Sequence, residues 1–442
     1  GQLFALHVTR LLKFVAFLSL SSSVIIVPAE SFAPSKSPLL KFSQTNYGVR
    51  SVLRRTNVYS TISARGDESY YSPSFASYGE RPMSSTITGQ QQQQKVTLTR
   101  FLSHAVQEKP ELREMISLLL AVQLACKSIS NLVTRVPSPP ITSTSSTTSA
   151  EYRSMKRLDE LSTIVLRNAL RFTGKFRMVK PANEDLQRRP LTITKQTSSK
   201  EEYQPGVLIA SALDSKYVAI FDPLDGSNNA DAAICTGTLF GVFEATTATE
   251  KEEDLMQSIL QPGRKLKAAG YCMYSSATIL VFTIGNGVHM FTLDPQINEF
   301  VLTNPNVCIP RRGSIYSCNE SNSEGWSKEM KSYISALKCG RGESGIRYTS
   351  RYVGSMVGDI HRTLIYGGVF MYPRDECYHP SGNIQLLYKS APLSFIISQA
   401  GGKSSNGEGD DVLDVTPKDV HERQPCFIGS PDDIDEMKKY ML

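Results

Sequence analysis

An apolar segment that ends in two acidic residues constrains this chain more than any other part of its sequence. Residues 217–221 read Tyr-Val-Ala-Ile-Phe, which is typical of a buried β-strand, and 222–227 read Asp-Pro-Leu-Asp-Gly-Ser. Carboxylate oxygens such as those of Asp222 and Asp225 are the ligands that Mg²⁺ prefers, and the glycine and serine after them can offer backbone N–H groups and a hydroxyl to a phosphate. The segment therefore predicts a metal and phosphate site, although Asp-Pro or Asp-Gly alone would indicate only a turn.

The composition excludes several classes of protein. With 442 residues, 40% of them apolar, the chain can bury a large core and has room for two domains. Ten Lys or Arg and four Asp or Glu in residues 1–96 account for the net charge of +6, so the remainder is near neutral and indicates no nucleic-acid surface. The eight cysteines form no Cys-x-x-Cys and no Cys/His cluster, which favours reduced thiols over disulfides or zinc.

The N-terminal residues have the composition of targeting segments. Arg10 and Lys13 precede an apolar, serine-broken stretch and then small residues, which predicts a signal peptide at 1–30 and argues against a membrane anchor in the mature form. Residues 31–95 are rich in Ser, Thr and Tyr and poor in acids, as in a transit peptide followed by a linker. This arrangement resembles the two-part presequence of algae with secondary plastids, so we expect a plastid location.

The remainder of the chain alternates between helical and strand patterns. Helices are predicted at 96–133, 155–172, 326–337, 355–365 and 391–400, and strands at 218–221, 239–244, 278–284, 288–293 and 314–317. A Ser/Thr/Pro-rich loop is expected at 137–150 and an irregular insertion at 176–199. Ser430 and Asp433 form a capping-box pattern ahead of a last helix. The alternation predicts an α/β protein of layered helices and sheets, with a second half that begins near residue 305.

Several ordered motifs together resemble the fructose-1,6-bisphosphatases, which are Mg²⁺-dependent sugar-phosphate phosphatases. The motifs lie at 222–227, 261–264, 268–271, 351–356, 361–364, 366–368, 400–402 and 429–433. The resemblance covers about residue 94 to the C-terminus and implies a five-layer αβαβα sandwich. It implies an N-terminal subdomain at 96–304, with the metal-site carboxylates and a lid loop, and a sugar-phosphate-binding subdomain at 305–442. The active site would lie between the two.

The same resemblance implies the roles of individual residues. The implied ligands of two or three Mg²⁺ ions are Glu201, Glu202, Asp222, Asp225 and the carbonyl of Leu224. Asp159 and Glu202 are the implied catalytic residues that activate water. The implied substrate-binding residues are Asp225, Gly226, Ser227, Asn319, Arg351, Tyr352 and Tyr372. Arg351 would reach the site of a neighbouring subunit, so the resemblance also implies a homotetramer.

The chain departs from the family pattern around Lys389, which replaces a metal-binding Glu. Asn383 and Gln385 replace a substrate-binding Lys and a nearby Arg, and Asn322 replaces a substrate Tyr. An ammonium about 5 Å from a divalent ion would be repelled by on the order of 6–7 kcal/mol at an effective dielectric constant of ~20. Lys389 must therefore turn away, lose its proton, exclude one metal ion or contact the substrate phosphate itself.

The sequence as a whole predicts a phosphatase that removes the 1-phosphate of fructose 1,6-bisphosphate. Hydrolysis of a phosphate ester needs an activated water and charge neutralisation, which clustered carboxylates and metal ions can supply. Two alternatives stay open at this point. One is a catalytically impaired binding or regulatory homologue, which the Lys389 departure would explain, and the other is an enzyme specific for sedoheptulose 1,7-bisphosphate, for which Asn322 and Asn383 leave room.

Overall fold

The computed structural model describes residues 95–135, 147–172, 176–179, 208–212, 217–245 and 252–441. The predicted signal peptide and nearly all of the predicted transit segment lie outside these residues. So do Glu201 and Glu202, and most of the loop and the insertion expected at 137–150 and 176–199.

The first half of the fold is built on an eight-stranded sheet in which every neighbouring pair is antiparallel and the strands follow their order in the chain. The strands are β1 (Phe176–Val179), β2 (Leu208–Ala212), β3 (Tyr217–Asp225), β4 (Thr236–Glu244), β5 (Ala268–Tyr274), β6 (Thr278–Thr283), β7 (His289–Asp294) and β8 (Glu299–Asn304). Side chains alternate across β3, so Val218 and Ile220 enter one core while Ala219 and Phe221 enter the other. Both faces of the sheet are thus covered, which explains the continuous apolar run in the sequence.

Three helices cover one face of this sheet: α2 (Leu98–Glu108), α3 (Arg113–Val133) and α4 (Thr147–Phe172). The single helix predicted at 96–133 is broken by a 3₁₀ turn at Pro110–Leu112, because proline has no N–H for the helical ladder. Pro110–Val133 is long and apolar enough to cross a membrane by length and composition. One face of the helix, with Leu118 and Val122, is buried against the sheet, whereas Leu120 and Leu124 are exposed.

The second half of the fold contributes a mixed five-stranded sheet in the order β10-β9-β11-β15-β13. Its strands are β9 (Ile315–Cys318), β10 (Thr349–Ser350), β11 (Val369–Tyr372), β13 (Lys403–Ser405) and β15 (Cys426–Gly429), and a separate two-stranded ladder joins β12 (Ile384–Gln385) to β14 (Arg423–Gln424). The longer helices here are α6 (Lys328–Cys339), α7 (Met356–Tyr366), α8 (Ala391–Gln399) and α9 (Pro431–Met441). The short helix α5 (Glu252–Ile259) contacts β3 and β4.

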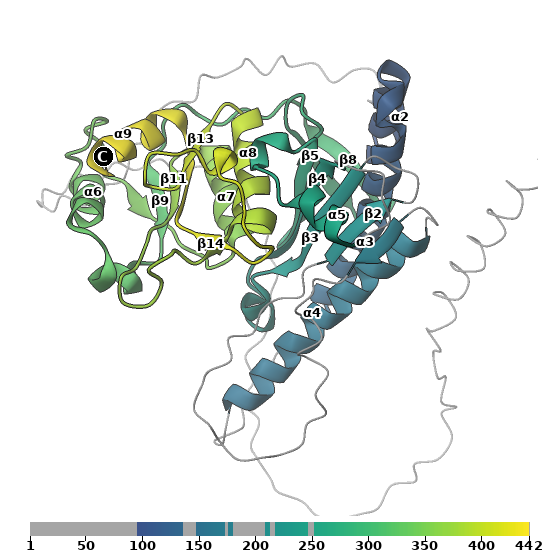
Figure 1. Ribbon diagram of the computed structural model, residues 1–442, viewed down its shortest axis with the longest axis horizontal. Coiled ribbons are helices and arrows are strands. Elements are labelled where there is room, and N and C mark those ends of the chain that lie inside the picture. Colours follow the sequence, from purple (N-terminus) through teal and green to yellow (C-terminus); the bar gives the residue numbers. More distant parts are fainter. Residues whose placement is uncertain are drawn as a thin grey trace, which may run out of the picture. The chain divides into compact units, whose positions relative to one another are not determined.

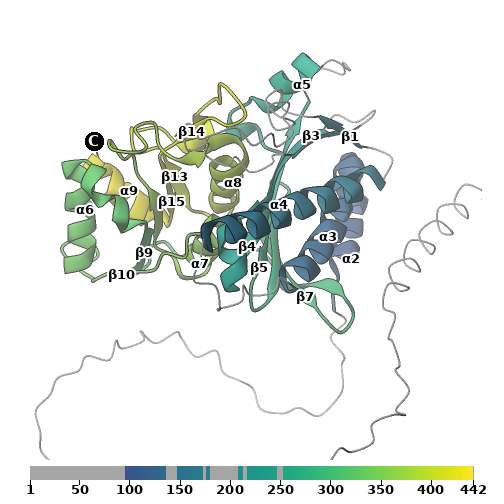
Figure 2. The ribbon, with the colours of Figure 1, turned by 90° about the horizontal axis from the view of Figure 1, so that it is seen from below.

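These elements stack in the order helix, sheet, helix, sheet, helix, as Figures 1 and 2 show. Helices α7 and α8 fill the space between the two sheets, and α6 and α9 cover the outer face of the small sheet. Three apolar clusters occupy the spaces between the layers. The predicted five-layer α/β sandwich is confirmed. The middle cluster unites Val218 of the large sheet with Leu393 of α8, so the two halves share one core.

Three local predictions were wrong. Residues 176–179, expected to be irregular, form β1 against β2, because strand pairing satisfies their backbone groups. Helix α4 begins at Thr147, inside the segment expected to be a loop. Ser430 does lie directly before α9, but its N–H donates to the carbonyl of Gly368 at 2.9 Å and not to Asp433, and its hydroxyl accepts from the N–H of Gly368 at 3.0 Å. A long-range partner therefore replaced the local capping bond.

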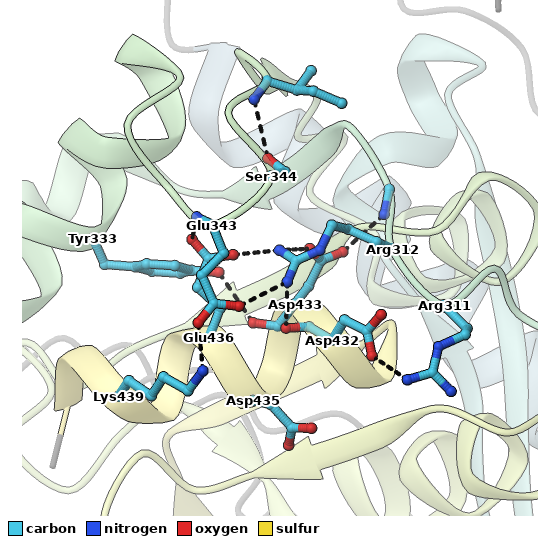
Figure 3. A network of polar contacts seen from close by, with 12 residues as sticks. Arg311, Arg312, Tyr333, Glu343, Ser344, Asp432, Asp433, Asp435, Glu436 and Lys439 are labelled. Carbon is cyan, nitrogen blue, oxygen red and sulfur yellow. Dashed lines mark hydrogen bonds and ion pairs between the residues drawn. The ribbon is translucent and has the colours of Figure 1, made fainter.

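Asp433 belongs to a cluster of charges at the start of α9 that Figure 3 shows from close by. Arg312 Nη1 lies 3.3 Å from Asp433 Oδ1 and also binds Glu436, and its Nη2 donates to Glu343 Oε2 at 3.0 Å. The side chains of Asp433 and Glu436 are only 1% exposed. Tyr348 donates a further hydrogen bond of 2.6 Å to Asp433, so a buried network ties α9 to two loops.

Candidate active site

The two acidic residues at the end of β3 are brought to the same side of the strand by a β-bulge. Asp222 pairs with Leu239 and Asp225 pairs with Gly237, so three steps along β3 match two along β4. In a regular strand, side chains three residues apart point to opposite faces of the sheet. The extra residue of the bulge changes this alternation, so both side chains point to the same face. Both carboxylates can therefore reach one group, which is the ammonium of Lys389.

The turn after the bulge is fixed against the start of α7. Gly226 has a φ of +70°, and a Cβ on it would lie 2.9 Å from Ser355 Cβ, so glycine is required here. Ser355 is the N-cap of α7, and its hydroxyl donates to Asp225 Oδ2 at 3.1 Å. The N–H of Val357 donates to the same oxygen at 3.2 Å. Asp225 is thus held at the positive end of α7.

Lys389 occupies the place between the two carboxylates. Its Nζ lies 3.1 Å from Asp222 Oδ2 and 2.7 Å from Asp225 Oδ1. The Lys389 side chain is 14% exposed, and those of Asp222 and Asp225 are 1% and 5% exposed. Burial alone would lower the pKa of Lys389, but the two carboxylates raise it above its ordinary range. In this structure the ammonium thus points toward the two carboxylates.

The two carboxylates respond differently to this arrangement. Burial raises the pKa of Asp222, and the attraction of Lys389 offsets only part of that rise. Burial also acts to raise the pKa of Asp225, but Lys389 and the donors at Val357 and Ser355 outweigh it, so that pKa is lowered. Asp225 is the firmly ionised partner of the ammonium, because it receives more hydrogen bonds than Asp222.

A pocket of about 360 Å³ opens beside the bulge. Its lining includes residues from both halves of the fold, among them Leu224, Asp225, Gly226, Ser227, Tyr352, Tyr372, Asn383, Lys389 and Arg423. Of the residues predicted for the site, the structure brings together the end of β3 with Tyr352 and Tyr372 from the second half. The pocket combines hydroxyl groups, turn backbone and two cationic side chains, which suits an anionic, polyhydroxylated ligand.

The other predicted residues lie around or away from this pocket. Asp159 is buried on α4, which packs against β3 and the short helix at Ser227–Ala232. Asn319 caps a 3₁₀ turn and accepts from the Ser321 hydroxyl at 2.7 Å, outside the pocket lining. Arg351 is exposed and donates to the carbonyl of Ser350. Nothing is described for Glu201 and Glu202.

Arg423 is a pocket residue that the sequence reasoning missed. The β12–β14 ladder pairs it with Gln385, and its guanidinium donates to the Asn383 side-chain oxygen. Asn383 Nδ2 in turn donates to the hydroxyl of Tyr372 at 3.2 Å. No motif surrounds Arg423 in the sequence, so only the ladder reveals it. It supplies a cation in the region where Asn383 stands in place of the family's lysine.

Asp359 is a second residue that the sequence reasoning missed. Its carboxylate accepts from the N–H groups of Val353 and Gly354, at 3.1 and 3.2 Å, and from Arg362 Nη2 at 2.7 Å. It is fully buried and holds the backbone next to Tyr352 in the pocket wall. The spacing of Asp359 and Arg362 by three helical residues was the available sequence signal.

A divalent metal ion would need several ligands that converge from the residues that the structure describes. Among them, no three or more His, Cys, Asp or Glu side chains converge in a way that could hold one. Asp222 and Asp225 are close enough to share a cation, but that cation is the Lys389 ammonium. With the ammonium in place, this pair of carboxylates does not fit a divalent ion.

The fold defines a layered α/β protein, and comparisons with known proteins agree with it. Family models described as the N-terminal and C-terminal domains of fructose-1-6-bisphosphatase match residues 96–305 and 309–442. The chain belongs to the fructose-1,6-bisphosphatase family. Members of this family are metal-dependent phosphatases of carbohydrate metabolism.

Individual relatives support the same assignment. A chloroplastic fructose-1,6-bisphosphatase of Triticum aestivum is 40% identical over 355 residues, covering 78% of this chain and 81% of that protein. A cytosolic one of Oryza sativa subsp. indica is 37% identical, covering 78% and 94%. The crystal structure of Leishmania major fructose-1,6-bisphosphatase in apo form is 34% identical with a TM-score of 0.63, covering 78% and 99%. The chloroplastic relatives support the expected plastid location.

Proposed function

We propose that this chain hydrolyses the 1-phosphate of fructose 1,6-bisphosphate and releases fructose 6-phosphate and phosphate. The observation that carries the proposal is the bulged end of β3, which opens onto a pocket of about 360 Å³ lined by Tyr352, Tyr372 and two cations. The relatives named above are all fructose-1,6-bisphosphatases, which favours this activity over a non-catalytic role and over sedoheptulose 1,7-bisphosphate.

The pocket residues suggest how the substrate would be held. Gly226 and Ser227 form a turn whose N–H groups and hydroxyl suit a phosphate oxygen, and Lys389 adds positive charge beside that turn. We assign the second phosphate to Arg423, whose planar guanidinium can donate two parallel hydrogen bonds. Tyr352 and Tyr372 would contact the sugar between the two phosphates. Asn319 remains a predicted substrate contact.

The catalytic residues that we propose are Asp159 and Glu202. A buried carboxylate such as Asp159 can accept a proton from an attacking water if its position is fixed, and α4 holds it beside β3. Mg²⁺ is the proposed metal, in the predicted number of two or three ions, with Glu201 and Glu202 as predicted ligands. Asp222, Asp225 and the Leu224 carbonyl were predicted as further ligands, but the first two already hold the Lys389 ammonium.

The proposal extends to the assembly of the protein. We propose a homotetramer, because Arg351 is exposed at the surface, as a contribution to a neighbouring subunit's site requires. The division into subdomains at 96–304 and 305–442 remains a prediction, as do the presequence segments at 1–30 and 31–95. No nucleic acid is expected as a partner.

Phosphate release by the full chain with Mg²⁺ tests the proposal. We expect release from fructose 1,6-bisphosphate at a higher kcat/KM than from sedoheptulose 1,7-bisphosphate. An Asp159→Asn variant should lose at least about 100-fold in kcat, since it removes the proposed proton acceptor. Faster release from the seven-carbon sugar would favour the second substrate, and no release from either sugar would favour the non-catalytic role.

A further inference from the structure

The position of Lys389 is imposed by the fold around it. It lies in a π-helical turn, Leu386–Ser390, of the kind that often occurs at functional sites. The N–H of Leu386 donates to the carbonyl of Glu422 at 2.8 Å, and the hydroxyl of Tyr388 is 3.1 Å from His421 Nδ1. Leu386, Leu387 and Tyr388 are each 1% exposed. The backbone that leads into the lysine is therefore anchored to the segment at Glu422 and His421.

The charges around the ammonium make it a suitable counter-ion for the carboxylates. Two carboxylates lie within 3.1 Å of Nζ, and Asp225 also receives bonds from Ser355 and Val357. The next acidic side chain of the pocket wall, Asp359, is already bound to Arg362 and to backbone N–H groups. A divalent ion on the same oxygens would have to displace the ammonium, because two cations that close together repel strongly.

We propose that the Lys389 ammonium is the permanent cation of the Asp222–Asp225 pair, so that the chain binds no divalent ion between these carboxylates. This inference deepens the proposed function, on which it rests for the assignment of the pocket to a phosphate. Since Lys389 also lines the pocket, the same ammonium neutralises the carboxylates and faces the bound phosphate. Metal ions can then bind only at other ligands.

Counting bound Mn²⁺ by electron paramagnetic resonance on the full chain, without substrate, tests the inference. The Lys389→Met variant leaves both carboxylates without their cation and should bind one more Mn²⁺ per chain than the wild type. The matched Lys389→Arg variant keeps a cation and should bind the same number as the wild type. An equal count for the methionine variant and the wild type would overturn the inference.

A second variant decides the matter if the methionine variant does not fold. Asp222→Asn keeps the Asp225–Lys389 pair and removes only one carboxylate. If the lysine is the resident cation, the number and the affinity of Mn²⁺ ions should equal those of the wild type. A tenfold or larger loss of Mn²⁺ affinity would show that Asp222 is a metal ligand. Phosphate release is measured separately, so a failure of the hydrolase proposal would be visible beside either result.

Discussion

At the scale of single residues, Arg423 offers the clearest test of how the pocket recognises its ligand. The Arg423→Leu variant removes a charge-assisted contact worth about 1.5–3 kcal/mol, so KM for fructose 1,6-bisphosphate should rise about 10–100-fold while kcat changes little. Steady-state kinetics measure both constants. Arg423→Lys keeps the charge and should recover part of the loss.

Fructose 1-phosphate provides the control for this prediction, because it lacks the second phosphate. The leucine variant and the wild type should hydrolyse it with the same kcat/KM. A loss on fructose 1-phosphate as large as that on the bisphosphate would mean that Arg423 acts through the structure of the pocket and not on the second phosphate.

Gly226 supports a second prediction at the residue scale. A Gly226→Ala change puts a Cβ on a left-handed residue and 2.9 Å from Ser355 Cβ, so it should destabilise the protein by about 1–3 kcal/mol. Denaturant unfolding measures this cost. Gly345 has a φ of +64° and open space around it, so Gly345→Ala isolates the backbone strain. If both variants lost equal stability, the contact with Ser355 would have no part in the effect.

At the scale of elements, the network at the start of α9 should make a large contribution to stability. Arg312→Met leaves the buried carboxylates of Asp433 and Glu436 without their cation, which should cost about 3–5 kcal/mol. The neighbouring Arg311 pairs with Asp432, and its side chain is 82% exposed. Arg311→Met should therefore lower the stability by only about 0–1 kcal/mol. Urea unfolding of both variants checks the difference, and similar losses for the two would contradict the assignment.

The elements show which parts of the fold the sequence could predict. The strand and the acidic turn at the end of β3 were predictable because they follow one another within residues 217–227, whereas the bulge between Asp222 and Asp225 was not predicted. Arg423 was not, because a two-residue ladder brings it beside Asn383, forty residues away. The capping box at Ser430 was wrong for a similar reason, since the Ser430 N–H that Asp433 would have bound donates to the carbonyl of Gly368. Patterns local to one element were readable, whereas contacts made between elements were not.

At the scale of the whole molecule, His361 predicts how stability depends on pH. Burial lowers the pKa of His361 from 6.5 to about 4. Between those two values the unfolded chain binds a proton that the folded protein excludes, so stability should fall as the pH falls from 6.5 towards 4. This loss of stability reaches about 3 kcal/mol near pH 4 and is absent above pH 6.5.

Comparing unfolding free energies at pH 7.5 and pH 4.5 tests this prediction. The His361→Gln variant should lose less stability between these pH values than the wild type, because its side chain takes up no proton. His104 on α2 is exposed, so His104→Gln should follow the wild type. An unchanged pH dependence in the His361 variant would rule out this histidine as the cause.

The metal site could be predicted only in outline, because its final form depends on packing between distant parts of the molecule. The acidic residues were visible in the sequence, and so was the unusual Lys389, but its effect depended on where the π-helical turn placed the ammonium. That placement follows from packing between the β12–β14 ladder, α8 and the end of β3. One lysine therefore changes a site that is assembled by both halves of the molecule.

The most direct test of this account is a crystal structure of the full chain soaked with Mn²⁺ and fructose 6-phosphate, with anomalous diffraction measured at the manganese edge. We predict the Lys389 ammonium between Asp222 and Asp225, the sugar phosphate beside Arg423, and no anomalous peak between the two carboxylates. A manganese peak between them, with the lysine turned away, would contradict the central claim.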